Sequence, residues 1–406
     1  MKKADRGRVR RLGGVETQGS GDLCSQIAYR AATATFKFRD GRFGAPLPLS
    51  GGTSGPVRID GADGYLVKNS DGVGSKVLIA QQMNKHDTIA HDLIAMVADD
   101  AAAIGAEPFA ATNTLDVAIA DPLLVAALFD GLVDACRIAR IAMVGGEIAQ
   151  LPQQVQGASD LPYIWNADVV GIAAKDRLLD GTKVAPGDAI IAVNSRGIRS
   201  NGLTLAMEIL QTRFGDDWQE QRFGNGNWGE RLLTPSLILT PFLVDLWSGY
   251  RSAALTCVHG IVHVTGGGVA GNLARILSKN RLGAEVFAPC PPQPEFLRLQ
   301  EWGGISDEEA YRVWNMGQSH LIITDDPEPV IAFARQEGIS LQVAGRIIDE
   351  PVVAITGKGA QSVRLEYKQE DRLLHKPLLL TGCGASPEVC QPGREVKQKL
   401  SPSRGV

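Results

Sequence analysis

The sequence predicts a two-domain α/β protein, or more loosely an α+β protein, and three observations support this. Strand-like and helix-like patterns alternate in both halves of the chain. A turn-rich polar stretch, residues 180–188, separates the halves and leads into a buried-type strand. The 406 residues are 44% hydrophobic and 21% charged, an ordinary composition for a chain that buries two cores.

Charge and apolar patterning exclude several classes of function. The net charge of −4 argues against nucleic acid as the main partner, because a duplex binder needs a basic face. No apolar run is long enough to span a membrane, and the basic start is not followed by the apolar region of a secretory signal. The cysteines show no CxxC spacing, which suits a reducing cytoplasm.

The first domain is expected over residues 61–174, after a segment at 1–60 that contains a glycine-rich loop. In that segment, residues 27–32 fit a short helix and residues 33–38 alternate like a strand. The later elements, in order, are a strand at 64–67, a helix at 88–105, a strand at 109–115, a helix at 123–139, a strand at 141–147 that ends in a Gly-Gly turn, and a strand at 168–174.

The second domain is expected over residues 175–357, and residues 358–406 read as a disordered, polar and proline-rich tail. Expected strands lie at 189–193, 257–264, 321–323 and 343–348. Expected helices lie at 203–214, 235–247, 269–277, 294–302, 307–314 and 327–336.

The stretch around which the first domain is organised begins at Ser70 and reads Ser-Asp-Gly-Val-Gly-Ser-Lys. Glycines at 72 and 74 allow close approach of phosphate oxygens to the backbone, and Lys76 can neutralise phosphate charge. The helix that follows carries Asp92, Asp99 and Asp100, and clustered carboxylates can hold Mg²⁺. These residues indicate nucleotide chemistry, although an Asp-Gly pair after a strand also fits an ordinary turn.

Several blocks, in their order along the chain, resemble the phosphoribosylformylglycinamidine cyclo-ligase family, the aminoimidazole ribonucleotide synthetases of purine biosynthesis. The resemblance covers about residues 20–357, and the ordered set is far more specific than any single block. The blocks are DGVGSK, HDTIAHDLIAM, DDAAAIGAEP, VGGEIAQ, RSNGLTL, HVTGGGVAGNLARIL and WNMGQSHLII.

The resemblance implies two α/β domains and a homodimer whose N-terminal sheets pair, with ATP bound near that seam. It implies that ATP phosphorylates the amide oxygen of formylglycinamidine ribonucleotide. The amidine nitrogen then closes the five-membered ring of aminoimidazole ribonucleotide, and ADP and phosphate leave. The protein mainly positions the reactants and neutralises charge.

The resemblance also implies roles for individual residues. Asp71, Lys76 and His263 are the expected catalytic residues; for His263 a role in orienting the glycine loop, and a purely buried structural role, stay open. A glycine loop that leads into a helix N-terminus suits an anion such as the ribose phosphate. The expected Mg²⁺ ligands are Asp71, Asp100 and Glu147. The expected binding residues for ATP and substrate are Gly72, Gly74, Asp92, Asp100, Asn201, Gly266, Gly267, Gly268, Asn315 and Gly317.

The chain departs from the family pattern at presumed site loops. Arg199 stands where a histidine is expected, and arginine stays charged and cannot carry out the same proton transfer. Arg42 lies in a loop less glycine-rich than expected, a Gly-Lys pair expected after residue 108 is missing, and Gln150 replaces a glutamate. Two alternatives therefore stay open: another ATP-dependent phosphotransferase of the same superfamily, or a non-catalytic nucleotide-binding paralogue.

Overall fold

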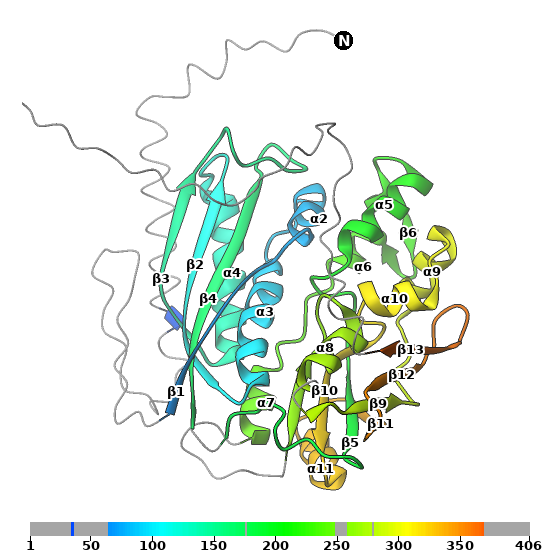
Figure 1. Cartoon of the computed structure of the whole chain (residues 1–406). Helices are drawn as coiled ribbons and strands as arrows, with labels where there is room; N and C mark the ends of the chain where they lie inside the picture. The colour runs from blue at the N-terminus through cyan, green and yellow to red at the C-terminus, as the bar shows by residue number, and fades with distance from the viewer. Residues whose placement is uncertain (1–33, 36–63, 175–176, 248–257, 278–279, 369–406) are drawn as a thin grey trace, which may run out of the picture.

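The two halves of the chain form two sheet-and-helix domains that lie side by side, with helix α3 between the first sheet and the second domain (Figure 1). This computed structural model describes residues 34–35, 64–174, 177–247, 258–277 and 280–368. The prediction of a mixed α/β class is confirmed. The expected helix at 27–32 and the loop around Arg42 lie outside the described residues.

The first sheet has four strands in the order β1-β4-β2-β3. Strands β1 and β4 are antiparallel, β4 and β2 are antiparallel, and β2 and β3 are parallel. The helices α3 and α4 cover one face of this sheet (Figure 1). The elements are β1 (Gly64–Gly72), α2 (Lys76–Met83), α3 (Ile89–Ala103), β2 (Glu107–Val117), α4 (Pro122–Ala139), β3 (Ala142–Gln150) and β4 (Tyr163–Ala174).

Helix α3 is apolar on nearly every side, because it is enclosed by both domains. Ile89, Leu93, Ile94 and Val97 are fully buried, and the helix packs against β1, β4 and α4 on one side and against α7 and β8 on the other. A helix that is apolar all round is expected in such a central position. Its few polar side chains therefore have to find partners inside the molecule.

The second sheet has seven strands in the order β13-β12-β9-β11-β5-β10-β8. Its strands are β5 (Ala189–Asn194), β8 (Gly260–His263), β9 (Gly283–Val286), β10 (Gln318–Thr324), β11 (Leu341–Ile348), β12 (Val352–Thr356) and β13 (Arg364–Lys368). Its helices are α5 (Leu203–Phe214), α6 (Trp228–Leu232), α7 (Thr240–Trp247), α8 (Gly268–Leu277), α9 (Pro294–Gly303), α10 (Asp307–Val313) and α11 (Pro327–Gln336). A short 3-10 helix, Trp218–Glu220, and a two-strand ribbon, β6 (Arg222–Phe223) with β7 (Gly226–Asn227), lie before α6.

Three expectations about local structure are wrong. Residues 34 and 35 lie in a helix, not in a strand. The tail cannot begin at residue 358, because β13 pairs with β12 through Lys368; the rest of the proposed tail lies outside the described residues. The Gly145-Gly146 pair is no turn, because β3 continues through it to Gln150. The remaining domain limits stay a prediction.

Gly146 serves close strand packing, since a Cβ atom there would lie 2.6 Å from Asn113 Nδ2 and 2.9 Å from Asn113 O. We expect Gly146→Ala to lower the free energy of unfolding by about 1–3 kcal/mol, as overpacking does. Gly271 on α8 is the control, because its Cβ would meet nothing within 4 Å. Gly271→Ala should raise stability by about 0.5–1 kcal/mol. Denaturant unfolding measures both; equal effects of the two variants would contradict this account of Gly146.

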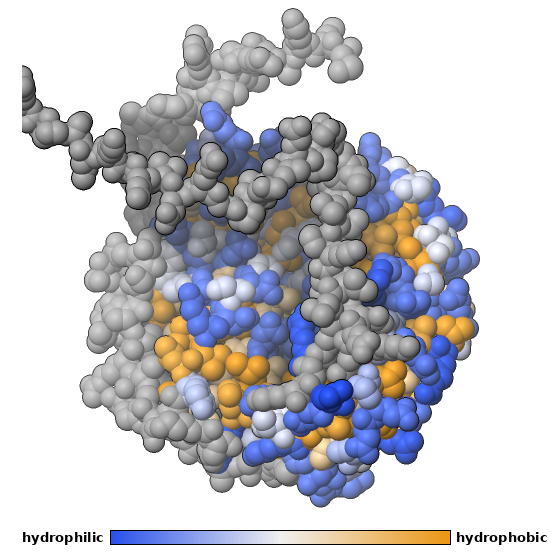
Figure 2. Space-filling model, in the orientation of Figure 1, coloured by the Kyte–Doolittle hydropathy of each residue, from blue (hydrophilic) through white to orange (hydrophobic). Residues whose placement is uncertain are grey.

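The surface seen in Figure 2 is mostly hydrophilic, with apolar residues gathered in patches between the charged ones. Large apolar side chains that stay exposed include Leu66 on β1 and Leu123 at the start of α4, at 67% and 82%. Among the described helices, none combines the length and the hydrophobicity that a membrane span requires.

Candidate active site

A cavity of about 400 Å³ lies between the two domains. One wall comes from β1 and α3, and the opposite wall comes from β8 and α8. Its walls include apolar side chains such as Val67 and Ile276, and its polar lining includes Asp100, His263 and Asn272. Two residues that the sequence singled out, one from each domain, therefore border one space.

Asp100 and His263 are in direct contact across this cavity, with 2.6 Å between Asp100 Oδ1 and His263 Nδ1. A carboxylate at this distance holds the proton on Nδ1 and leaves the lone pair of Nε2 free. Nε2 has no hydrogen-bond partner among the described residues. Burial lowers the pKa of His263 well below its ordinary value, and the charge of Arg199 lowers it further. His263 is therefore a neutral imidazole, and its Nε2 is buried as well as unpaired among the described residues.

Asp71 lies at the end of β1, on the side of the sheet that faces α3. Burial raises the pKa of its carboxyl, the N–H of Gly72 lowers it, and the nearby charge of Asp100 raises it. Burial also raises the pKa of Asp100, against the opposing charges of Arg199 and Arg275. Two carboxyl groups that disfavour each other's charge are well suited to share a cation.

The glycine loop at residues 266–268 leads into the N-terminus of α8, as expected. Asn272 fixes its shape, because its Nδ2 donates to the carbonyl oxygens of Gly268, Thr265 and Gly266 at 2.7, 3.3 and 3.3 Å. Asn201 borders this loop, with Oδ1 3.6 Å from where a Cβ on Gly266 would stand. The arrangement leaves Gly266 exposed at a helix N-terminus that favours anions.

The first domain's glycine turn meets the same region. A Cβ on Gly74 would have Ser200 O as its nearest neighbour, at 3.8 Å, and Ser75 Oγ lies 2.9 Å from Thr204 Oγ1. Gly74, Asn201 and the 266–268 loop therefore lie along one edge of the domain interface. The binding roles of these residues stay predictions.

Lys76 and Asp92 do not face the cleft, and their expected roles at the nucleotide are corrected here. Lys76 Nζ is fully buried, at 2.8 Å from both carboxylate oxygens of Asp92 and 2.7 Å from Thr234 O. Asp92 also accepts a hydrogen bond from Ser236 Oγ at 2.5 Å. The pair is an internal clamp between α2, α3 and the second domain, and neither charge is available to a phosphate.

Asn315 and Gly317 also have structural roles in place of the expected binding roles. Asn315 is buried, and its Nδ2 donates to Gly197 O and Ile198 O at 2.9 and 3.2 Å. Its Oδ1 accepts from Gly317 N at 2.9 Å. Gly317 has φ +95°, and a Cβ there would lie 2.5 Å from Pro291 O. Both residues shape the loop that carries Arg199.

Glu147 does not join Asp71 and Asp100 within one chain. The strand order places β3 three strands away from β1, which is roughly 14 Å at ordinary strand spacing. Asp71 aligns with Ala167, whereas Glu147 aligns with Thr114 and through it with Asn166, so the two carboxylates point to opposite faces of the sheet. The expected three-carboxylate Mg²⁺ site is therefore wrong for Glu147 in a single protomer.

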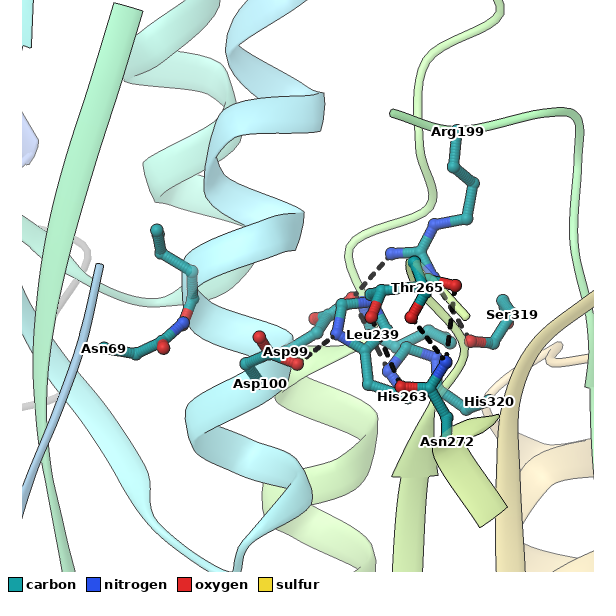
Figure 3. A network of polar contacts seen from close by, with 12 residues as sticks. Asn69, Asp99, Asp100, Arg199, Leu239, His263, Thr265, Asn272, Ser319 and His320 are labelled. Carbon is teal, nitrogen blue, oxygen red and sulfur yellow. Dashed lines mark hydrogen bonds and ion pairs between the residues drawn. The ribbon is translucent and has the colours of Figure 1, made fainter. Parts of the chain in front are cut away.

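A buried cluster next to His263 was missed by sequence reasoning (Figure 3). Arg199 is turned inward: its Nη1 lies 3.2 Å from Ser319 O and its Nη2 lies 3.4 Å from Asp99 Oδ2. Asp99 also accepts from Thr240 Oγ1 at 2.7 Å. His320 packs flat on His263, with ring centroids 4.4 Å apart and planes 2° apart. The only sequence signal was Arg199 in place of the expected histidine.

This cluster is not built as a metal centre. Asp99, His263 and His320 do place ligand atoms within 4.8 Å of one another. However, the parallel rings direct their in-plane lone pairs side by side, so these cannot converge on one ion. Arg199 also already pairs with the Asp99 carboxylate. The cluster therefore supports the wall of the cleft through packing and hydrogen bonds.

We expect the buried imidazole of His320 to make the protein sensitive to acid. Burial lowers its pKa well below the ordinary value, with further lowering by His263 and Arg199. In the unfolded chain the same histidine takes up a proton near pH 6.5, whereas in the folded chain it stays neutral there. Protonation therefore favours the unfolded chain, and the folded protein loses stability as the pH falls below about 6.5. Burial raises the pKa of Asp99 to about 7, which acts in the opposite direction between about pH 4 and 7.

The variant His320→Phe isolates the contribution of His320. Its free energy of unfolding should fall less steeply than that of the wild type between pH 7.5 and 5.5, by up to about 1 kcal/mol for each pH unit. Denaturant unfolding at a series of pH values gives both slopes. Parallel curves would show that His320 is protonated equally in the folded and unfolded chain.

Comparisons with known proteins agree with this fold. Family models for the N-terminal and C-terminal domains of AIR synthase related proteins match residues 51–173 and 185–358. The hydrogenase maturation protein HypE of E. coli has a similar fold, with a TM-score of 0.58 and 18% identity over 85% of this chain and 97% of that one. These matches define a two-domain protein of the AIR synthase related class.

Proteins whose sequences are more similar to this chain identify its family within this class. The phosphoribosylformylglycinamidine cyclo-ligase of Thermococcus kodakarensis is 34% identical over 330 residues, which is 81% of this chain and 92% of that protein. The cyclo-ligase of Methanosarcina barkeri is 35% identical over 310 residues, or 76% of this chain and 87% of that protein. The chain belongs to the phosphoribosylformylglycinamidine cyclo-ligase family, and the resemblance seen in its motifs is confirmed.

Proposed function

We propose that this protein closes the imidazole ring of aminoimidazole ribonucleotide. ATP phosphorylates the formamide oxygen of formylglycinamidine ribonucleotide, and ADP leaves. The amidine nitrogen then attacks the activated carbon, the carbon–oxygen bond breaks, and phosphate leaves with the oxygen. A proton is lost from the amidine in this step, so a base near the ring-forming nitrogen assists the reaction.

The observation that supports this most is the meeting of groups from both domains at one cavity. Asp100 from the first domain and His263 and Asn272 from the second line this cavity. Asp71 lies close enough to Asp100 for that charge to raise its pKa, and Asn272 holds the 266–268 loop through hydrogen bonds. Ring closure needs these two chemistries together: charge neutralisation for phosphoryl transfer, and a proton acceptor for cyclisation. The membership in the cyclo-ligase family supports the same reaction.

Asp71 and Asp100 fit a magnesium site, because two partly buried carboxylates in repulsive proximity gain from a divalent cation. When bound, Mg²⁺ would neutralise the phosphate oxygens of ATP during transfer. Gly74 leaves the backbone near Asp71 open to phosphate, because a Cβ there would have only Ser200 O within 4 Å. Gly72 is packed against Asn166, and its N–H donates to Asp71 Oδ1 at 2.7 Å. His263, held by Asp100 through Nδ1, is the proposed acceptor of the amidine proton, and its buried Nε2 has no other partner among the described residues.

Gly266, Gly267 and Gly268, with Asn201 beside them, are the proposed seat of the ribose phosphate. Glu147 acts at this site only if a second protomer brings it there, and the proposed homodimer, with paired N-terminal sheets, offers that route. The proposed location is the cytoplasm, where the pathway's nucleotides are dissolved. No nucleic acid or membrane partner is proposed.

The test supplies purified protein with ATP, Mg²⁺ and formylglycinamidine ribonucleotide, and follows ADP and aminoimidazole ribonucleotide together. Equal amounts of both products support the proposal. ADP without aminoimidazole ribonucleotide would instead support another phosphotransferase. ATP binding with no turnover would indicate the non-catalytic paralogue, for which the changed residue at Arg199 is the motivation.

A further inference from the structure

We propose that His320 is a positioning residue that fixes the ring plane of His263 in the active site. Its nearest ring is that of His263, and the two imidazoles are almost parallel (Figure 3). The expected effect on kcat rests on the proposed ring closure, whereas the expected restraint on the His263 ring does not.

The contact follows from sheet register. β8 and β10 are antiparallel, and His263 lies directly opposite His320. Side chains of directly opposed residues stand on the same face of the sheet with their Cβ atoms about 5 Å apart, which is a natural distance for stacking. The stacking is therefore built into the backbone of two paired strands, β10 and the edge strand β8, and needs no adaptable loop.

Asp100 alone does not define the orientation of His263. A hydrogen bond at Nδ1 restrains one atom, and the ring can still swing about that bond. A flat partner at 4.4 Å and 2° removes this freedom, because any tilt breaks the ring contact. With both restraints, Nε2 is held in one direction. A proton acceptor that is displaced by about 1 Å can cost on the order of 10²-fold in rate.

His320 itself has no polar task among the described residues. Both of its ring nitrogens are fully buried without a hydrogen-bond partner, and its Nε2 is 3.9 Å from Asp99 Oδ2, beyond hydrogen-bond range. A buried polar group without a partner is costly. His320 therefore acts on His263 through ring contact alone, which is a positioning role. A proton relay would need a hydrogen bond at one of the ring nitrogens of His320.

Arg199 and Asp99 support the strand segment that carries His320. Arg199 Nη1 donates to Ser319 O, the carbonyl next to His320 in the chain, at 3.2 Å. Asp99 fixes the guanidinium and is itself held by Leu239 N at 3.0 Å. The residue at which the chain departs from its family pattern thus supports the strand that carries the stacking ring.

The test compares His320→Phe, which keeps a flat ring, with His320→Leu, which is also apolar but has no ring. We expect His320→Leu to lower kcat by about 10–100-fold with KM changed by less than about threefold, and His320→Phe to stay within about threefold of the wild type. Phe333→Ala is the control, since it removes a ring that is stacked on Phe242 at 5.7 Å and does not line the cavity. It should lower thermal stability and leave kcat unchanged.

A second readout does not depend on activity. Carbon-13 relaxation of the histidine rings should show a rigid His263 imidazole in the wild type and in His320→Phe, and a mobile one in His320→Leu, while Asp100 keeps the proton on Nδ1 in all three. An inactive wild type with this pattern would overturn the proposed function and keep the positioning role. Folded His320→Leu with wild-type kcat and a rigid His263 ring would overturn the positioning role, and so would His320→Phe as impaired as His320→Leu.

Discussion

Replacing Lys76 with methionine is expected to lower the free energy of unfolding by about 3–5 kcal/mol, the usual cost of removing one partner of a buried ion pair. The change leaves the Asp92 carboxylate fully buried without its cation, and leaves Thr234 O without its donor. Denaturant unfolding measures the loss. Because two charges in an apolar interior also cost free energy, the double variant Lys76→Met with Asp92→Leu should regain much of it.

The matched control for this prediction is Lys68→Met. Lys68 pairs with Asp168 at 3.1 Å, but its side chain is 65% exposed, so its removal should cost less than about 1 kcal/mol. The double variant at Lys76 and Asp92 should still release ADP in response to substrate. A single Lys76→Met variant with wild-type stability and no turnover would restore the catalytic role that the sequence predicted for this lysine.

Replacing Asp71 with asparagine should lower kcat/KM for ring closure by about 10²–10³-fold, the range seen when one preorganised charge-stabilising group is removed. Stability should stay unchanged or rise slightly. Burial and the nearby Asp100 raise the pKa of this carboxyl, so the folded protein disfavours its charge, and the neutral amide removes that repulsion. Initial rates of ADP release and a melting curve give both quantities.

Asp168→Asn provides the control for Asp71→Asn. Asp168 lies on the neighbouring strand opposite Ser70, and its carboxylate faces away from the cleft and pairs with Ser70 and Lys68. Its loss should leave the rate of ring closure unchanged. Comparable rate losses in both variants would mean that the charge of the sheet as a whole, and not a site at Asp71, governs turnover.

Helices and strands that are indicated by one strong local signal could be predicted from the sequence. The apolar period of α3 and the proline start of α4 each led to an element in the expected place. The strand expected at 64–67 instead runs on to Gly72, and helix α2, which begins at Lys76, was not predicted. Asp121 caps α4, accepting from Leu123 N and Leu124 N at 2.9 Å each. These signals are local, because capping, helical period and glycine turns involve neighbours in the chain.

Roles that depend on distant partners were not predictable. The sequence cannot show that Lys76 is enclosed by Thr234 from the other domain, or that Gly146 makes room for Asn113. The stacking of His263 on His320 depends on the register of two strands far apart in the chain. The short strands β9 and β12 were missed because runs of four or five residues carry little periodic signal.

The three aspartates of α3 have a consequence for engineering. Each finds a main partner in the other half of the molecule or in a group tied to it: Asp92 at Ser236, Asp99 at Thr240 and Asp100 at His263. A fragment that ended between the halves would leave Asp99 without the donors described here, and would leave Asp92 only Lys76 and Asp100 only Asn69. Swapping one half for that of a homologue would yield a folded chimera only if the matching hydroxyl and imidazole groups were transplanted with it.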